Sequence, residues 1–382
     1  MGANGNNRAL RVLHIDPERN WGGGEAQVFG LLAYLAERRH QSVLVAHPEG
    51  DLWARVGSLR VERRPLIIRN EFDLAAAFRL RQVIAREPFD IVHFHTKRAH
   101  ALALWAPHGP ARPRYVVTRR MDYPLKRNWY THSLYNDRVD LVIAISSSIA
   151  EVLTRGGIGR GKIRVIHSGI DVDRFSAVPR SAGGGMPVIA SLSIMEERKG
   201  QRYLLEAARL LKSRGRSFRY LLAGDGPLLG EYQKQAKDFG IEEDVVFSGW
   251  IDDVPAFLSA IDIFVMPSLF EGLGVAVLEA MAAGKPVVAT NVGGLAESVV
   301  DSETGFLVRP RETAALAAAI DKLAQDSELA RAMGTRGAER VRAHFSLARM
   351  AAENEACYYA LVSEAAAKSP PAGLGRQPTA AH

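Results

Sequence analysis

Cysteine is almost missing from this sequence: Cys357 is the single one in 382 residues. One cysteine excludes a disulfide framework and a zinc site built from several cysteines, and it is typical of a protein from a reducing compartment. Cys357 lies in a late alanine-rich helical stretch with no histidine spaced near it. We therefore interpret Cys357 as a structural residue.

Long hydrophobic runs are missing as well. No uncharged apolar segment reaches the roughly 18 residues that a transmembrane helix needs. Residues 1–8 are polar and precede a strand-like run instead of an apolar signal core, so we expect a cytoplasmic protein. An apolar content of 47% and a charged content of 24% exclude disordered and fibrous chains. The length favours two domains.

Common nucleotide-site patterns do not occur either. The glycine run Trp21–Glu25 (WGGGE) is neither the Gly-x-Gly-x-x-Gly of dehydrogenases nor a P-loop with its Lys-Ser/Thr. This argues against a dehydrogenase and a nucleotide hydrolase. No Asp-x-Asp follows a strand, as a metal–diphosphate site would need. The pair Asp171 and Asp173 is interpreted as part of a structural turn after His167–Ile170.

Positive charge is concentrated in the first half. Residues 1–180 carry 28 Lys and Arg against 17 Asp and Glu, a net +11, whereas the remainder carries 21 against 25, a net −4. An anionic membrane surface and a phosphorylated lipid-linked acceptor both fit this asymmetry, and so does a solvated arginine-rich surface. No helix-turn-helix, zinc-finger or aromatic RNA-binding signature is present, so we expect no nucleic acid partner.

Short β-branched runs alternate with longer helical stretches, which predicts an α/β chain with parallel sheets. The predicted strands are 10–15, 42–46, 91–95, 115–118, 141–145 and 163–166 in the first half, and 188–193, 220–223, 245–248, 263–266 and 286–289 in the second. The first half includes predicted helices over 24–38 and 73–86. We place the domains at 9–175 and 187–345, joined by the Pro- and Gly-containing linker 175–187. A last helix over 346–366, which we expect to cross back to the first domain, and a disordered tail over 367–382 follow. Two such halves imply a ligand cleft between them.

The most informative segment runs from Pro267 to Glu297. A strand is followed by a glycine-containing loop and by a helix from about Val275, which Gly284 and Pro286 end. Backbone N–H groups at such a turn approach an anion closely, and the helix N-terminus adds about half a positive charge. A diphosphate fits there.

Two glutamates accompany this turn. Glu271 lies in the loop and Glu279 lies eight residues on, so both can face one pocket. Carboxylates repel phosphate, and they are better suited to accept hydrogen bonds from sugar and ribose hydroxyls. Taken alone, the pair also fits a capped helix with one glutamate at its start and one on its surface.

Residues 247–297 resemble the signature of glycosyltransferase family 4, whose members have the GT-B fold. The shared pattern is a glutamate, seven residues, a second glutamate, a Pro-Val-Val strand and a Gly-Gly-x-x-Glu turn. The resemblance implies an α/β protein with two facing Rossmann-like domains. It also implies a retaining, metal-independent transfer from a nucleotide diphosphate-sugar, which is a substrate and not a cofactor. No carboxylate is a convincing covalent nucleophile.

The resemblance also assigns roles on the donor side. Glu271 would hold the donor sugar near the reacting carbon and Glu279 would bind the ribose. The loop Gly272, Leu273 and Gly274 would offer N–H groups to the phosphates, and Trp250 and Ile251 would lie beside the base. Family members carry an arginine and a lysine, several residues apart, that bind the diphosphate. The cations in Ser191–Gly200 (SLSIMEERKG) are adjacent, Arg198 and Lys199, and Lys199 fits better.

On the acceptor side, the glycine run with Gly23 and Gly24 matches the family loop that faces the donor from across the cleft, although a plain flexible turn has the same composition. His95 matches a family histidine that points into the cleft and acts in catalysis. His93 and His95 lie on one strand face, but without a third ligand at sensible spacing we expect no metal.

The expected acceptor pocket combines cations with aromatics; the cations are Arg119, Arg120, Lys126 and Arg127. An exposed loop with incidental charge is the alternative. The sequence thus predicts a glycosyltransferase acting on a glycan or lipid-linked acceptor in lipopolysaccharide or other envelope polysaccharide synthesis, in the cytoplasm with peripheral membrane contact. The rival interpretations are a nucleotide-sugar epimerase on the same fold and a non-catalytic sugar-nucleotide-binding module.

Overall fold

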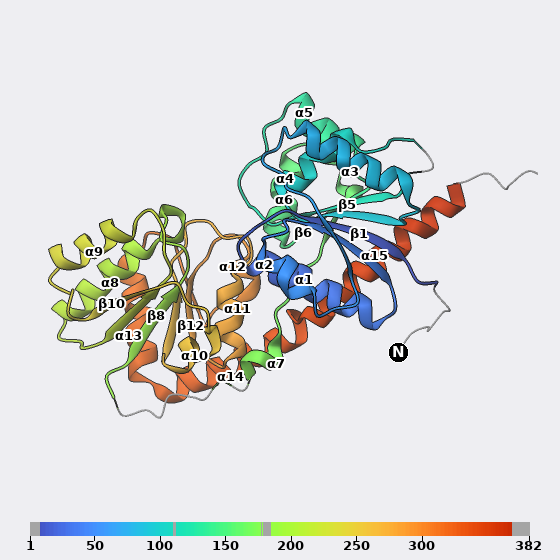
Figure 1. Ribbon diagram of the computed structural model, residues 1–382. Coiled ribbons are helices and arrows are strands. Elements are labelled where there is room, and N and C mark those ends of the chain that lie inside the picture. The colour runs from blue at the N-terminus through green and yellow to red at the C-terminus, as the bar shows by residue number, and fades with distance from the viewer. Residues whose placement is uncertain (1–7, 110–111, 177, 179–184, 369–382) are drawn as a thin grey trace, which may run out of the picture.

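The computed structural model describes residues 8–109, 112–176, 178 and 185–368 (Figure 1). Within these residues the chain forms two α/β units, each built around one parallel sheet. Residues 367 and 368, predicted as the start of the tail, are the last two of a helix. The rest of the predicted tail and much of the predicted linker lie outside the described residues. No helix among the described residues is both long enough and apolar enough to cross a bilayer.

The first sheet has seven described strands, in the order β3-β2-β1-β4-β5-β6-β7, all parallel. They are β1 (Arg11–Asp16), β2 (Gln41–Ala46), β3 (Glu62–Pro65), β4 (Ile91–Phe94), β5 (Arg114–Arg119), β6 (Leu141–Ala144) and β7 (Ile163–Val165). β4 and β6 are buried along their whole length. β6 is a continuous apolar run, as is usual for a strand with both faces covered, whereas β4 includes His93.

The second sheet has six described strands, in the order β10-β9-β8-β11-β12-β13, again parallel. They are β8 (Val188–Leu192), β9 (Arg219–Ala223), β10 (Val245–Gly249), β11 (Ile263–Met266), β12 (Val287–Thr290) and β13 (Phe306–Val308). This is the Rossmann strand order, with the order reversing between β8 and β11. In the first sheet the reversal falls between β1 and β4. Ligands of such sheets bind beyond the carboxyl ends of the strands at this point.

Helices cover both faces of each sheet, as right-handed crossovers between parallel strands require. In the first unit they are α1 (Gly23–Glu37), α2 (Asp51–Val56), α3 (Leu74–Arg86), α4 (Lys97–Ala101), η1 (Leu102–Trp105), α5 (Trp129–His132), η2 (Ser133–Asp137), α6 (Ser147–Arg155), η3 (Arg160–Lys162) and α7 (Val172–Ser176). In the second they are η4 (Glu197–Lys199), α8 (Gln201–Ser213), α9 (Leu229–Asp238), α10 (Val254–Ser259), α11 (Val275–Ala282), α12 (Leu295–Ser298), α13 (Thr313–Gln325) and α14 (Ser327–His344).

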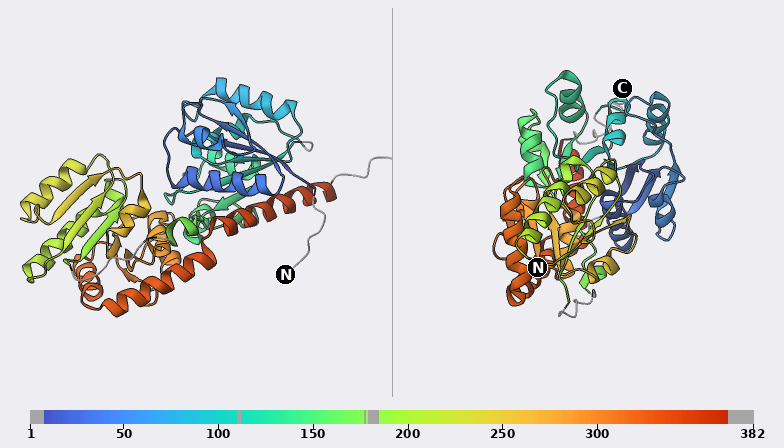
Figure 2. Two further views of the ribbon diagram at one scale, coloured as in Figure 1. Left: turned by 60° about the horizontal axis from the view of Figure 1, so that its bottom comes forward. Right: turned by 90° about the vertical axis from the view of Figure 1, so that its left-hand side faces the viewer.

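The last helix, α15 (Leu347–Lys368), returns to the first unit. Figure 2 shows α14 lying along the second unit and α15 running on beneath the first. Leu347 approaches α1 so closely that a Cβ added at Gly30 would lie 2.7 Å from its Cδ2. Tyr358 is completely buried, and Glu355 accepts hydrogen bonds from Arg38 Nε at 2.9 Å. The chain end is therefore part of the core of the first unit.

Two strands do not follow from the sequence pattern, β3 and β13. Both lie at an edge of their sheets, and β3 is a polar segment, Glu-Arg-Arg-Pro, with mostly exposed side chains. An edge strand obtains its hydrogen bonds from one neighbour and need not bury a face, so its side chains carry no apolar alternation. The other predicted strands agree with the structure to within two residues at each end.

Candidate active site

The start of α11 lies at the carboxyl end of β11, at the reversal point of the second sheet. Gly274 precedes the helix with φ +82°, a left-handed conformation, and an added Cβ would lie 2.4 Å from Leu295 Cδ2. Gly293 packs under the same loop, where an added Cβ would lie 2.0 Å from the Glu271 carbonyl oxygen. Only glycine fits these positions. The loop thereby presents backbone N–H groups at a helix N-terminus.

Glu271 is fixed in this loop by two neighbours. Lys199 Nζ lies 2.6 Å from Glu271 Oε2, and Ser268 donates a hydrogen bond to the same oxygen at 3.2 Å. Glu271 is 8% exposed, so the ion pair is largely removed from water. Lys199 comes from η4, which follows the adjacent strand β8. The structure therefore brings two residues of the predicted site, 72 positions apart, into direct contact.

Arg198 is placed differently from Lys199. Its guanidinium pairs with Glu196, and its carbonyl oxygen accepts a hydrogen bond from the Leu269 N–H at 2.7 Å. Its side chain is thus directed to its own loop, and its backbone supports the loop that carries Glu271.

Glu279 lies on α11, two turns after the start of the helix, and is partly buried. Burial raises the pKa of Glu279 to about 7, against the opposing effect of the Arg174 charge. A carboxyl group that is easily protonated near neutral pH is ready both to donate and to accept a hydrogen bond.

The predicted base site lies after β10. Trp250 is 64% exposed, and its indole N–H donates to Asp252 Oδ1 at 2.9 Å, while Ile251 is partly buried. Sequence reasoning missed the neighbouring turn Gly224–Pro227. An added Cβ at Gly224 would lie 2.0 Å from the Ser193 carbonyl oxygen, so this turn packs on the loop after β8. Its Gly-Asp-Gly-Pro sequence directly after a strand was the available signal.

The two units touch at the glycine loop of the first. An added Cβ at Gly23 would lie 3.3 Å from Cγ2 of Val275, the first residue of α11. An added Cβ at Gly24 would lie 3.6 Å from Arg120 Cδ, and one at Gly272 would lie 2.5 Å from the Arg120 carbonyl oxygen. The predicted donor loops of the two halves are therefore in van der Waals contact with each other.

Glu297 of the second unit makes a second contact with the first unit. Its carboxylate accepts hydrogen bonds from the Ser147 and Ser148 N–H groups at 2.9 and 3.1 Å, at the N-terminus of α6, and lies 2.9 Å from His167 Nε2. Burial would raise the pKa of Glu297, but these hydrogen bonds, with that of His167 the largest, lower it to about 2. Glu297 ends the Gly-Gly-x-x-Glu turn, so this turn has an interdomain partner.

This contact predicts a pH-dependent contribution to stability. The pKa of Glu297 is lower in the folded protein than its ordinary value of 4.5, so its contribution is complete above pH 4.5 and is lost as the pH falls towards 2. Glu297→Gln, which resembles the protonated form, is expected to cost about 1–3 kcal/mol at pH 7. Thermal unfolding at several pH values checks this: the Tm gap to the wild type should close below pH 3. A gap that is the same at pH 7 and pH 3 contradicts it.

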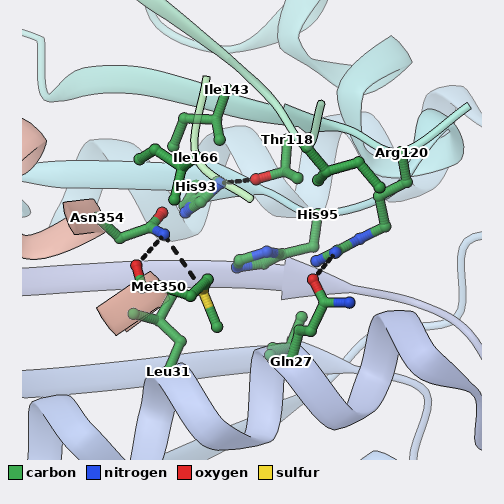
Figure 3. A pocket seen from close by; sticks show the side chains of 12 residues that line it. Gln27, Leu31, His93, His95, Thr118, Arg120, Ile143, Ile166, Met350 and Asn354 are labelled. Carbon is green, nitrogen blue, oxygen red and sulfur yellow. Dashed lines mark hydrogen bonds between the residues drawn. The ribbon is translucent and has the colours of Figure 1, made fainter. Parts of the chain in front are cut away.

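Three histidines form a buried cluster at the carboxyl ends of β1 and β4. His14 Nδ1 lies 3.0 Å from His95 Nε2, and His93 bonds to Tyr358 Oη at 2.6 Å and to Thr118 Oγ1 at 2.7 Å. All three are at most 2% exposed, and burial lowers the pKa of each. In Figure 3, His93 and His95 line a small cavity of about 10 Å³, the room of about one water molecule. His95 is buried, and it lines both this cavity and a larger one of about 190 Å³ beside it.

The cluster gives His93 and His95 a third histidine that could act as a metal ligand. Sequence spacing offered no third partner for His93 and His95, but the structure supplies His14 from β1, and the ligand atoms of the three lie within 4.8 Å of one another. Strand pairing sets His14 directly beside His93, which sequence spacing could not show. Four of the six ring nitrogens already have hydrogen-bonding partners; His14 Nε2 and His95 Nδ1 have none among the described residues. A metal ion held by all three rings would displace a hydrogen bond of His93, because both of its ring nitrogens are bonded.

The larger cavity, of about 190 Å³, lies in the first unit, where the acceptor is predicted to bind. Its lining includes Lys97, His100, Arg119, Met121 and Tyr135. Arg119 is 5% exposed and donates to the carbonyl oxygens of residues 121 and 123, so it shapes the loop after β5. Arg120 also lines this cavity. The remaining two predicted acceptor cations, at positions 126 and 127, lie exposed on that loop.

Comparison with known proteins places this site in a family. The model for glycosyltransferase family 4 matches residues 21–174, and the model for glycosyl transferases group 1 matches residues 178–340. The lipopolysaccharide core biosynthesis glycosyltransferase LpsE of Rhizobium meliloti is 31% identical over 354 residues, 88% of this chain and 95% of that protein. The chain belongs to glycosyltransferase family 4. It is a glycosyltransferase with the GT-B fold.

A further relative and two solved structures are also similar to this glycosyltransferase. A GDP-mannose-dependent phosphatidylinositol monomannoside mannosyltransferase of Mycobacterium tuberculosis is 29% identical over 377 residues, 91% of this chain and 96% of that protein. Among solved structures, a glycosyltransferase from Rickettsia africae has a TM-score of 0.81 at 21% identity, covering 93% of this chain and 99% of that one. HepE from Anabaena in complex with UDP-glucose has a TM-score of 0.79 at 21% identity, covering 92% and 100%. These likenesses extend over both units.

Proposed function

We propose that this glycosyltransferase moves a sugar from a nucleotide diphosphate-sugar to a glycan or lipid-linked acceptor in the synthesis of lipopolysaccharide or another envelope polysaccharide. The observation that carries the proposal is the Lys199–Glu271 pair, 2.6 Å apart, beside the glycine-headed N-terminus of α11. A cation and N–H groups suit a diphosphate, and the adjacent carboxylate suits sugar hydroxyls. The two relatives named for lipopolysaccharide core synthesis and for a GDP-mannose-dependent transfer support this substrate class.

The chemistry of the transfer needs positive charge where the leaving group forms. As the bond from the anomeric carbon to the diphosphate breaks, negative charge grows on the phosphate oxygens. Lys199 and the N-terminus of α11 are oriented in advance to stabilise that charge, so we propose that no metal ion takes part. Glu271 lies on the sugar side, where its negative charge offsets the positive charge that develops on the anomeric carbon.

We further propose that the configuration at the anomeric carbon is retained. Both neighbours of Glu271 bond to the same oxygen, Oε2, which holds the carboxylate in place beside the diphosphate site. A carboxylate that is fixed there, instead of behind the sugar ring, favours departure and attack on one face over a covalent sugar–enzyme intermediate.

A donor panel tests the proposal. Wild-type protein is incubated with UDP-, GDP- and ADP-sugars and a set of glycan and lipid-linked acceptors, with and without EDTA. The expected result is transfer that requires an acceptor, is unchanged by EDTA and gives a product with the donor's anomeric configuration by NMR. Turnover of a donor in the absence of acceptor would instead identify an epimerase. Binding without any turnover would identify a binding module.

Peripheral contact with an anionic membrane is part of the proposal. Large apolar side chains are exposed on α3 and just before it, with Phe72 75%, Leu74 57% and Phe78 61% exposed, and Trp129 of α5 is 78% exposed. Figure 1 shows α3 and α5 at the same end of the first unit, and Lys97 Nζ bonds to Glu71 Oε1 at 2.7 Å beside Phe72.

We call these four apolar side chains, Phe72, Leu74, Phe78 and Trp129, the apolar rim. Exposed cations at positions 69, 79, 126 and 127 lie on the same segments. Apolar side chains beside cations suit the surface of an anionic bilayer, where each cation contributes about 1 kcal/mol. The rim belongs to the unit with the larger cavity, so a lipid-linked acceptor would enter that cavity at the membrane surface.

Charge reversal at the rim tests this contact. Phe72→Glu with Phe78→Glu is expected to weaken binding to phosphatidylglycerol vesicles at least tenfold in sedimentation, because two apolar side chains become anionic. Activity on a water-soluble acceptor should be unchanged. Val246→Glu, at a 41% exposed apolar position on β10 of the second unit, is the matched control and should bind like the wild type. Equal vesicle binding by all three proteins would show that the rim does not contact lipid.

A further inference from the structure

The cations of the donor corner are already paired with carboxylates. Lys199 lies 2.6 Å from Glu271, and the guanidinium of Arg198 pairs with Glu196 in its own loop. The diphosphate of a nucleotide sugar brings two negative charges, and a third appears when the sugar leaves. Paired cations screen such charge less well than free ones. Further positive charge for the diphosphate would have to come from the facing unit. This inference rests on the function proposed above.

Arg120 is the cation of the first unit that lies at this corner. It directly follows β5, and its Cδ and Nε would both lie 3.6 Å from a Cβ added at Gly24. Its carbonyl oxygen would lie 2.5 Å from a Cβ added at Gly272 in the donor loop. The neighbouring Gly23 touches Val275, where α11 begins. Arg120 is thus set between the glycine loop of one unit and the diphosphate loop of the other.

The guanidinium of Arg120 retains capacity for a ligand. Of its five N–H donors, one bonds to Gln27 Oε1, and no other hydrogen bond of this side chain occurs within the described residues. Figure 3 shows the guanidinium directed towards Gln27, away from His93. A partly buried guanidinium with free donors is suited to bind phosphate oxygens at two points.

The acids near Arg120 do not fully balance its charge. Asp16 and Glu25 are the carboxyl groups that interact with it. Burial, followed by the charge of Glu25, raises the pKa of Asp16 to about 7, and burial also raises the pKa of Glu25. Near neutral pH part of this acidic pair is protonated, which leaves Arg120 with positive charge available for an anion.

We propose that Arg120 binds the donor diphosphate from the facing unit and completes the phosphate site when the two units are in contact. This role differs from the acceptor role that the sequence predicts for Arg120. Because the carbonyl oxygen of Arg120 lies against Gly272, any separation of the units would withdraw the guanidinium. The diphosphate and the contact between units would then stabilise each other.

Calorimetric titration with UDP, GDP and ADP, and with the matching nucleosides, tests the proposal on the full chain. Arg120→Met is expected to weaken binding of the preferred nucleoside diphosphate about tenfold and to leave binding of its nucleoside unchanged. The KM for the donor should rise and the KM for the acceptor should stay the same. Arg120→Lys keeps a positive charge but cannot bind at two points, so its affinity for the diphosphate should lie between those of the wild type and Arg120→Met. This second variant keeps the test valid if Arg120→Met folds poorly.

Arg160→Met, at an exposed position of η3 in the first unit, is the control and should not alter diphosphate binding. The proposal is overturned if Arg120→Met binds the diphosphate as the wild type does, and an accompanying rise in the KM for the acceptor would return Arg120 to the acceptor site. If the wild type itself binds none of the three diphosphates, the proposed function fails, which is a different and recognisable outcome.

Discussion

Glu271→Gln is expected to lower kcat by about 10²–10³-fold at saturating donor. The carboxylate is 2.6 Å from Lys199 and 8% exposed, so a neutral amide removes a charge that acts in a largely dry site. Preoriented charges of this kind are worth about that factor when one is removed. The amide keeps the size of the side chain, and the loop around it should remain in place. Initial rates over a range of donor concentrations measure the effect.

Two comparisons make the Glu271 result specific. Glu328→Gln, at an exposed position near the start of α14, should retain wild-type kinetics. Glu279→Gln should raise the KM for the donor more than it lowers kcat, because its proposed partner is the ribose and not the reacting carbon. A Glu271→Gln enzyme with kcat within threefold of the wild type would remove Glu271 from the catalytic site.

Gly272→Ala is expected to lower kcat/KM by about 10–100-fold through the approach of the two units. The new Cβ would lie 2.5 Å from the Arg120 carbonyl oxygen, a distance that real Cβ atoms do not reach, so the backbones must separate. Misplacement of reacting groups by about 1 Å can cost about 10²-fold in rate. Steady-state kinetics with both substrates measure the effect, and thermal unfolding shows whether the protein remains folded.

The matched control is another glycine-to-alanine change in the second unit. Gly230 lies in α9 with open space where its Cβ would be, so Gly230→Ala should leave kinetics unchanged. In the proposed site the nucleoside contacts only the second unit, so nucleoside affinity should be the same in Gly272→Ala and in the wild type. Full activity of Gly272→Ala would mean that the transfer step does not need this contact between units.

The shape of the candidate donor site could be predicted because its parts are contiguous in sequence. The strand β11, the glycine turn and α11 follow one another within 267–297, and local chemistry decides each step. Gly274 needs a left-handed conformation, and a helix start attracts anions. The contact of Lys199 with Glu271 also follows once both are placed after neighbouring strands at the reversal point of one sheet.

The remainder depends on pairings between distant segments. His14 joins His93 because β1 and β4 are neighbours in register, and a single histidine in a buried strand gives no sign of this. Glu297 finds its partners in the other unit, about 150 positions away. The position of Arg120 follows from how the two units meet, which neither hydrophobic periodicity nor local spacing encodes.

A crystal structure with a bound nucleotide sugar tests the central claim most directly. We expect the diphosphate at the N-terminus of α11, within hydrogen-bonding distance of the Leu273 and Gly274 N–H groups and of Lys199 Nζ, with the sugar beside Glu271. Density for the nucleotide elsewhere, with this corner of the second unit holding only solvent, would contradict the account.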